Sequence, residues 1–400
     1  MSDYVEIFTT YIVNGARDAL SKVQQSTGTV SDKDRVQAWH LLGYALGVQA
    51  AWPQVRQLLL DLAPKMEMAG YRDEWLAFLR AGAERSVAQQ DLAVEARLSL
   101  SIGLLLRLTN DYSEAERWLN RGLFSFQSLG DAHGIASVYN QMGRIRYLQH
   151  QDTEAVQFAQ NALGLLADDD PERAESYFVL GMAALHQRQW ESAEQSHRLS
   201  LAIRQQSGDP RTIAWAMQNV GTVLTQQSEY GGVDRLVEAA EWLEQAALLL
   251  ESLPDPFHSA VARNSLALVH FQRGELEKAT RLFCQAEIVF QTSNSPEWRA
   301  RVLNNLGLIY LQSGQLIEAE KIFRSAVAIY AQLGDHADRL NSQHGIVLAL
   351  LAQQRFAEAA ALCQQGLTEL DALKDAPAQY AEKESWYRSS LVRAQAGLRA

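Results

Sequence analysis

The side chains with the clearest chemical promise are carboxamides that return at one place in a repeated pattern. They stand three and two residues before a small residue, Gly or Ala, in four stretches of the chain. These carboxamides are Asn140 and Gln141, Gln218 and Asn219, Asn264, and Asn304 and Asn305. A carboxamide both donates and accepts hydrogen bonds, so a row of them can hold an extended peptide by its backbone. The chemistry that they offer is hydrogen bonding rather than catalysis.

Signatures of catalysis and of metal binding are missing from the sequence. None of the nine histidines belongs to a His-Glu-x-x-His motif, and there is no Cys-x-x-Cys pair or Gly-x-Ser-x-Gly elbow. The acidic run 168–170 precedes Pro171, and we interpret it as a helix cap and solvated turn rather than a metal site. The sequence therefore predicts a protein that is not an enzyme and needs no cofactor or metal.

One pattern returns about every 40 residues. A short stretch, such as Leu316 to Ala319, begins the second segment of each repeat and ends in Ala. This Ala lies twelve positions after a small or permissive residue. The paired positions are Gly103 and Ala115, Gly143 and Ala155, Gly181 and Ala193, Ala267 and Ala279, Gly307 and Ala319, and Val347 and Ala359, with Gly221 and Ala239 separated by six additional residues. A chain built from repeats of 20 to 50 residues predicts a stack of identical supersecondary units.

Each unit has the pattern of two amphipathic helices. In one unit Val302, Leu306 and Ile309 place apolar side chains on one face of the first helix, and Phe323 and Val327 do so in the second. We expect helices to end at Gly130 and Gly334, and Pro171, Pro210, Pro256 and Pro296 to begin four first helices. Strand patterns are missing, so the sequence predicts an all-α fold.

The residues of this unit carry a resemblance to a known family. The stretch from Asn304 to Tyr310, followed by Gly314, Ala319, Phe323 and Ala326, resembles a tetratricopeptide repeat. That family usually repeats every 34 residues, and the longer period here resembles the long-helix subclass of kinesin light chains and bacterial regulators. The resemblance implies a right-handed α-solenoid superhelix of antiparallel helix pairs.

The resemblance also divides the chain. Residues 91–375 are predicted to form seven units of about 40 residues, one with a short insertion at 229–233. Residues 1–90 are predicted to form an N-terminal helical cap with one degenerate pair and an extra helix, over 4–25, 33–50, 53–69 and 72–89. Either 72–89 is an inserted helix or 33–50 is the second helix of a pair. Residues 376–400 are predicted to form a C-terminal capping helix, over 377–397.

The family binds partners on a concave surface lined by the first helix of each pair. Counting the Gly or Ala as the eighth position, positions two, five, nine and twelve point inward, with six beside them. The peptide-binding residues predicted in this way are Asn140, Gln141, Arg144, Tyr147, Glu175, Phe178, Gln218, Asn219, Asn264, Arg301, Asn304 and Asn305. Other inward residues are Arg97, Arg107, Trp215 and Phe271. In the alternative interpretation, the amides bond within and between helices and the arginines form ion pairs with neighbouring helices.

Composition limits the partners. The formal charge of −11 disfavours nucleic acid and anionic membranes, and no apolar run is long enough to span a bilayer. Arginines in the groove favour an acidic segment or a carboxylate. Cys284 and Cys363 are expected to be small buried hydrophobes, and the chain is expected to be cytoplasmic.

The expected function is a non-catalytic scaffold or adaptor that binds a peptide or protein segment in its concave groove. The alternative is a bacterial sensor or regulatory module that binds a small signalling peptide and changes its superhelical shape. A regulator of that kind usually needs an output domain, such as a DNA-binding helix-turn-helix, and this acidic chain has no pattern for one.

Overall fold

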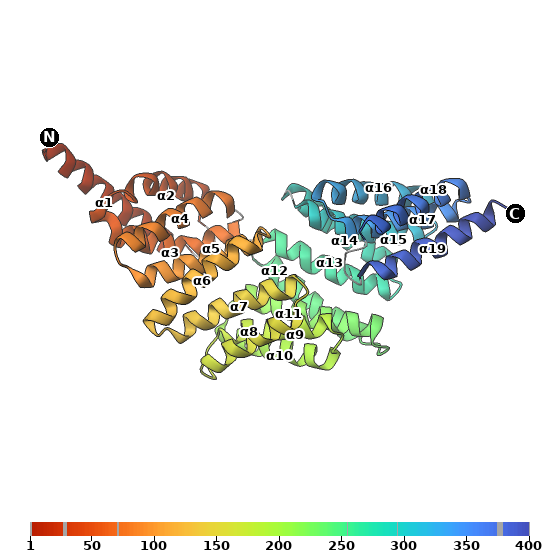
Figure 1. Ribbon diagram of the computed structural model, residues 1–400, viewed down its shortest axis with the longest axis horizontal. Coiled ribbons are helices and arrows are strands. Elements are labelled where there is room, and N and C mark those ends of the chain that lie inside the picture. The colour runs from red at the N-terminus through yellow and green to blue at the C-terminus, as the bar shows by residue number, and fades with distance from the viewer. Residues whose placement is uncertain are drawn as a thin grey trace. The chain divides into compact units, whose positions relative to one another are not determined.

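The regular elements of the protein are helices joined by short turns (Figure 1). The structure is a computed structural model that describes residues 2–26, 30–69, 72–253, 255–293, 295–373 and 379–399. Across these residues there are nineteen α-helices, one 3₁₀ turn and no strand. The helices form two compact units, residues 1–207 and 208–400. The predicted all-α solenoid of antiparallel helix pairs is therefore confirmed.

Unit 1 contains ten α-helices within its described residues. Asp91, Asp111 and Asp131 each begin a helix by accepting a hydrogen bond from a backbone N–H three residues later. The elements are α1 (Ser2–Gln25), α2 (Asp32–Ala45), η1 (Gln49–Ala51), α3 (Trp52–Ala69), α4 (Arg72–Ala88), α5 (Leu92–Leu108), α6 (Tyr112–Leu129), α7 (Ala132–Leu148), α8 (Asp152–Leu165), α9 (Arg173–His186) and α10 (Trp190–Ser207).

Unit 2 contains nine α-helices within its described residues. Pro210, Pro256 and Pro296 begin helices as predicted, because the first turn needs no backbone N–H at that place. The elements are α11 (Pro210–Tyr230), α12 (Leu236–Glu251), α13 (Pro256–Gln272), α14 (Leu276–Thr292), α15 (Pro296–Gln312), α16 (Leu316–Leu333), α17 (His336–Ala352), α18 (Phe356–Ala372) and α19 (Gln379–Gly397).

The prediction that Pro171 begins a helix is wrong. Pro171 lies in the turn that precedes α9, which starts at Arg173. The N-cap of α9 is Glu172, and the turn before it is closed by Asp170, whose side chain accepts a hydrogen bond from the backbone N–H of Glu172 at 2.9 Å. This places the acidic run in a capped turn, as expected.

The repeated small residue marks the point where the two helices of a pair cross. We call α5, α7, α9, α11, α13, α15 and α17 the A helices and α6, α8, α10, α12, α14, α16 and α18 the B helices. A Cβ added to Gly307 on α15 would lie 2.6 Å from the ring of Phe323 on α16, and one added to Gly103 would lie 2.6 Å from Leu119. Glycine is required here because a large side chain already fills the crossing.

Two helix ends confirm the glycine prediction. Gly130 ends α6 with φ +67°, and Gly334 ends α16 with φ +70°. Only glycine adopts this left-handed conformation without steric cost. The insertion predicted at 229–233 lengthens α11 to Tyr230 and leaves residues 231–235 as the connection to α12.

The N-terminal region differs in detail from its prediction. The helix expected over 33–50 ends at Ala45 and is followed by the 3₁₀ turn. α4 packs between α3 and α5, where Gly82 faces Leu59 of α3 and Leu98 of α5. A B helix packs between two A helices, so α4 corresponds to a B helix. Because A and B helices alternate along the chain, α2 also corresponds to a B helix. It favours 33–50 as the second helix of a pair.

The cysteine prediction is half wrong. Cys363 is fully buried, but Cys284 is exposed on α14. Both are free thiols. Among the described helices, none is long and apolar enough to cross a membrane.

Candidate functional site

In unit 1 the first carboxamide is built into the protein. Asn140 on α7 has no exposed surface. Its Nδ2 donates to Oε1 of Glu172 at 2.7 Å, and its Oδ1 accepts from Oγ of Ser176 on α9 at 2.8 Å. Burial, with the Glu175 carboxylate nearby, raises the pKa of Glu172 to about 7. Both ends of the Asn140 amide are therefore satisfied by the next repeat.

Beside Asn140, one carboxylate joins two guanidinium groups. Glu175 on α9 accepts from Arg144 of α7 at 3.0 Å and from Arg204 of α10 at 2.8 Å. Burial would raise the pKa of Glu175, but the charges of Arg144 and Arg204 outweigh burial and lower it to about 2. The guanidinium of Arg144 also lies over the ring of Phe178, 4.6 Å from its centroid.

The remaining predicted residues of unit 1 join the same cluster. Nε of Arg107 on α5 donates to Oε1 of Gln141 on α7 at 3.0 Å, and both side chains are buried. Tyr147 meets Phe178 edge to face, with ring centroids 6.1 Å apart. The structure thus brings the six predicted residues of α7 and α9 together and gives Asn140, Gln141, Arg144 and Glu175 partners within the protein.

Unit 2 presents its carboxamides differently. Asn304 on α15 accepts from Oγ of Ser342 on α17 at 2.9 Å, and Nε2 of Gln218 reaches Oγ of Ser265 only at 3.5 Å. Asn219 and Asn305 are partly exposed and make no side-chain hydrogen bond to any described residue. Several amides of unit 2 therefore keep bonding capacity that a ligand could use.

Asn264 on α13 is the exception among the three asparagines at position five. Its side chain is only 7% exposed, yet its Oδ1 is buried without a hydrogen-bond partner. A buried acceptor left in this state costs about 1–3 kcal/mol. This oxygen is therefore an unsatisfied acceptor enclosed within the repeat stack, where a ligand on the surface does not reach it.

The predicted arginine of unit 2 is a surface residue. Arg301 is exposed, pairs with Glu297 one helical turn away at 3.3 Å and lies over the ring of Trp298 at 4.8 Å. It is therefore accessible, unlike Arg144. Of the other inward candidates, Arg97 is exposed, whereas Trp215 packs on His258 with ring centroids 4.7 Å apart.

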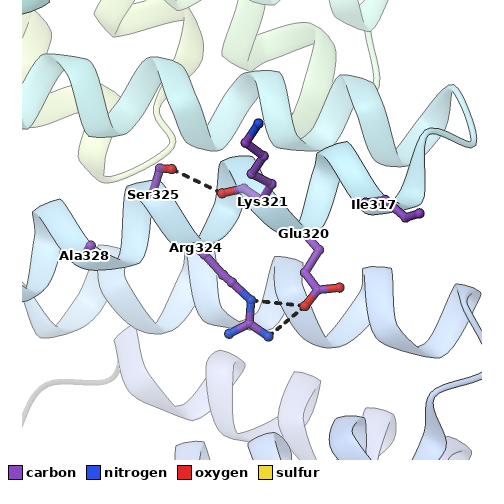
Figure 2. Close-up of a pocket in the computed structure, with 6 residues that line it drawn as sticks. All are labelled: Ile317, Glu320, Lys321, Arg324, Ser325 and Ala328. Carbon is purple, nitrogen blue, oxygen red and sulfur yellow. Dashed lines mark hydrogen bonds and ion pairs between the residues drawn. The ribbon is translucent and has the colours of Figure 1, made fainter.

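Two shallow depressions lie on B helices rather than on A helices. One, of about 570 Å³, runs along α16, and Figure 2 shows its lining residues: Ile317, Glu320, Lys321, Arg324, Ser325 and Ala328. The other, of about 400 Å³, is lined by residues 191, 194, 195, 198 and 199 of α10. Each is formed by one helix and contains a Glu–Arg pair four residues apart. A surface formed by one helix encloses no ligand, so we do not assign a site there.

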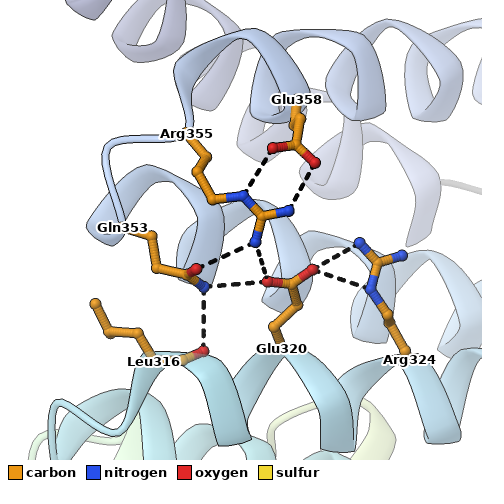
Figure 3. A network of polar contacts seen from close by, with 6 residues as sticks. All are labelled: Leu316, Glu320, Arg324, Gln353, Arg355 and Glu358. Carbon is orange, nitrogen blue, oxygen red and sulfur yellow. Dashed lines mark hydrogen bonds and ion pairs between the residues drawn. The ribbon is translucent and has the colours of Figure 1, made fainter.

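A polar network that the sequence did not indicate is centred on Glu320 of α16. Glu320 is buried and accepts from Arg324 at 2.7 Å, from Gln353 at 3.1 Å and from Arg355 at 2.6 Å, and Arg355 also pairs with Glu358 (Figure 3). Burial would raise the pKa of Glu320, but its hydrogen bonds to Arg324 and Gln353 and the charge of Arg355 lower it. This network ties α16 to the turn before α18.

Sequence reasoning missed the partners of the predicted residues. Glu172, Ser176, Arg204 and Ser342 complete the contacts but stand outside the inward positions. Ser176 and Ser342 each lie five residues before the residue at a helix crossing, so their shared position was available as a signal. Among the described residues, no group of three His, Cys, Asp or Glu side chains is placed to hold a metal.

This arrangement of paired helices with polar A-helix faces defines a class: a helical-repeat protein that offers hydrogen-bonding surface. The sequence profile described as tetratricopeptide repeat matches residues 134–206 and 298–368. These two segments are thus tetratricopeptide-like repeats, as the resemblance predicted for them. Comparison with curated protein sequences gives no match.

Solved structures share the fold at low sequence identity. A Rap protein complexed with Competence and Sporulation Factor is 16% identical, has a TM-score of 0.57, and covers 86% of this chain and 98% of its own. Aspartyl phosphate phosphatase F from Bacillus subtilis is 13% identical, with a TM-score of 0.55 and coverages of 85% and 95%. The apo form of the quorum sensor NprR from B. thuringiensis is 14% identical, with a TM-score of 0.53 and coverages of 72% and 79%.

Proposed function

We propose that this protein is a non-catalytic scaffold or adaptor that binds an extended peptide or protein segment along the A-helix face of unit 2. The observation that carries the proposal is the spare bonding capacity of the partly exposed amides of Gln218 and Asn219 on α11 and of Asn305 on α15. An extended backbone supplies alternating donors and acceptors, which is the complement of such a row.

The chemistry of the partner follows from the charges on the same face. Exposed Arg301 favours a segment with an acidic side chain near α15, because a guanidinium pairs well with a carboxylate. The net charge of −11 opposes nucleic acid and anionic membranes as partners. A cytoplasmic location is part of the proposal, since both cysteines are free thiols, as is usual in a reducing compartment.

The second candidate is a sensor that binds a signalling peptide and changes shape. It is supported by the Rap protein complexed with Competence and Sporulation Factor and by the quorum sensor NprR, which have the same fold. The two candidates differ in what binding does. A sensor should change its small-angle scattering profile when peptide binds, whereas a scaffold should keep it.

The test uses a heptapeptide selected on the wild-type protein from a phage-displayed random library. Replacing Asn219 and Asn305 together with Ala should weaken this peptide roughly 5- to 100-fold, because each lost hydrogen bond is worth about 0.5–1.5 kcal/mol. The matched control replaces Gln285 and Gln364, exposed carboxamides on B helices, with Ala and should leave binding unchanged. Equal affinity in both double variants would move the binding site away from the A-helix face.

A further inference from the structure

The first turns of α1 extend beyond the helices on which the rest of α1 packs (Figure 1). The second half of α1 lies against α2 and α3 and contributes Ile12, Ala19 and Val23 to the core of unit 1. By contrast, every residue from Tyr4 to Phe8 is exposed, and so is Tyr11. This helix therefore has a packed C-terminal half and an exposed N-terminal half.

The exposed half of α1 carries a continuous apolar stripe. Its members are spaced i, i+3, i+4 and i+7, so they lie on one side of the helix: Tyr4, Ile7, Phe8 and Tyr11. The exposed fractions of the three rings are 81% for Tyr4, 50% for Phe8 and 74% for Tyr11. Single exposed apolar residues are normal on a protein, but a contiguous patch indicates a surface that a partner covers.

Phe124 on α6 shows an isolated exposed ring in the same unit. This ring is 70% exposed. The residues one helical turn away on either side are all polar, namely Asn120, Arg121, Gln127 and Ser128. Phe124 therefore has the exposure of the α1 rings without their apolar neighbours, and it supplies a matched control for the stripe.

The area of the stripe is close to what a dimer needs. An aromatic side chain presents roughly 150–250 Å², so the exposed parts of Tyr4, Phe8 and Tyr11 amount to roughly 300–500 Å² on one copy. Two copies that covered these rings with each other would bury roughly 600–1,000 Å², and Ile7 adds to this. Specific interfaces begin near roughly 1,000 Å² in total, so a second copy is sufficient to form a small, reversible interface.

The stripe is also complementary to itself. Its midpoint lies between Ile7 and Phe8, so a two-fold axis at that point aligns two copies of α1 antiparallel. Ile7 then meets Phe8 of the partner subunit, and Tyr4 meets Tyr11 of the partner subunit. An antiparallel pair also leaves the packed half of each α1, with the helices around it, at opposite ends of the pair.

The charge of this region favours a second copy over a charged partner. From residue 4 to residue 13 the only charged side chain is Glu6. Glu6 lies two residues from both Tyr4 and Phe8, on the other side of the helix, where it stays in water. A strongly acidic or basic partner helix would bury charges that no residue of the stripe pairs, at a cost in affinity. A second copy brings an equally uncharged stripe.

We propose that the protein forms a reversible dimer in which the stripe of Tyr4, Ile7, Phe8 and Tyr11 packs antiparallel against the same stripe of a second copy. This inference goes beyond the proposed function, because α1 lies outside the A helices and the test uses no peptide. A dimer presents two copies of the A-helix face of unit 2. A partner that displays its segment twice would therefore bind more tightly than a single segment does.

Sedimentation equilibrium of the whole protein tests the dimer. Wild type should show a monomer–dimer equilibrium with a Kd on the order of 1–100 µM, as suits an interface of this area. Phe8→Glu should weaken dimerisation at least roughly 10-fold, because its carboxylate would be buried without a partner. The control, Phe124→Glu, adds the same charge on the isolated ring and should leave the equilibrium unchanged. A wild type that is monomeric at about 500 µM, or equal dimerisation in both variants, would overturn the proposal.

A charge exchange tests the antiparallel register. Ile7→Lys should weaken dimerisation as Phe8→Glu does, but an equimolar mixture of the two variants should associate at least roughly 10-fold more tightly than either alone. In the mixed dimer the new ammonium faces the new carboxylate, and the unchanged Phe8 and Ile7 meet on the other side of the axis. Both positions are exposed, so circular dichroism should show unchanged helix content. A mixture that associates no better than its components would contradict this pairing and leave the stripe to a different partner.

Discussion

The A-helix faces of the two units place the same residue types in different hydrogen-bonding environments. In unit 1, Asn140 has no exposed surface and both ends of its amide are bonded within the protein. In unit 2, Asn264 has the same position in its repeat and keeps an unpartnered oxygen. The residue itself is identical, so the difference is made by the neighbour, Ser176 in one case and Val302 in the other. An asparagine at this position is hydrogen-bonded or left unpartnered according to the residue that the next repeat places beside it.

The arginines of the two units differ in a similar way, in their partners and their exposure. Arg144 of unit 1 is held by Glu175 and lies on Phe178, whereas Arg301 of unit 2 is exposed and pairs with Glu297 of its own helix. An internally bonded guanidinium stabilises the repeat stack, and an exposed one remains able to contact a partner. We therefore expect variants of unit 1 to affect stability and variants of unit 2 to affect binding.

The largest effect is expected at Glu175. Glu175→Ala removes the carboxylate shared by Arg144 and Arg204, and breaking this partly buried cluster, which leaves two guanidinium groups without their partner, should cost roughly 3 kcal/mol. The control, Arg301→Ala, removes an exposed pair and should cost less than about 0.5 kcal/mol. Native-state hydrogen exchange of the α9 and α15 amides measures both values. Similar losses in the two variants would mean that the units do not differ in this way.

A somewhat smaller effect is expected from acid. His197 of α10 faces Gly181 at the helix crossing of its pair, just as Phe323 faces Gly307 at the crossing of a pair in unit 2. Neither ring nitrogen of His197 has a hydrogen-bond partner. Burial lowers the pKa of His197 from 6.5 to about 4, so between these values the folded state binds fewer protons than the unfolded state. The free energy of unfolding is therefore unaffected by His197 above pH 6.5 and decreases as the pH falls below it, by about 2 kcal/mol at pH 5.

His197→Leu isolates that contribution, because Leu119 and Leu243 face the same crossing in other repeats. The variant should gain stability over wild type when the urea midpoint is measured at pH 5 rather than at pH 7. Glu172 acts in the opposite sense, since its raised pKa favours the folded state as the pH falls from 7 to 4.5. In the pH dependence of wild-type stability the two effects oppose each other, so the wild-type protein alone does not reveal either one. An equal advantage at both pH values would show that His197 does not titrate in this range.

The smallest effect concerns single amides. Asn140→Ala leaves Ser176 and Glu172 without their partner and should cost about 1 kcal/mol, because Glu172 is only partly buried; hydrogen exchange of α7 and α9 again measures the loss. Asn219→Ala in unit 2 removes no internal bond, so its cost should stay within about 0.5 kcal/mol. If Asn219→Ala proved as costly as Asn140→Ala, the amides of unit 2 would be structural too.

From α5 onward, the sequence by itself determined the helices, their pairing and the points where they cross. These depend on local spacing: apolar residues on one helix face, and a glycine such as Gly307 where Phe323 leaves no room for a Cβ. It also determined which positions carry carboxamides. It did not determine that Pro171 precedes its helix or that Cys284 is exposed, because both depend on how one turn and one helix face are placed.

Only the tertiary structure decided which predicted site residues are already occupied. The serine partners of Asn140 and Asn304 lie 36 and 38 residues further along the chain, on the next A helix. The partners of Glu175 come from α7 and α10. Whether a polar group is free depends on which side chains the stack brings within about 3 Å of it, and residue spacing along one helix carries no such distance.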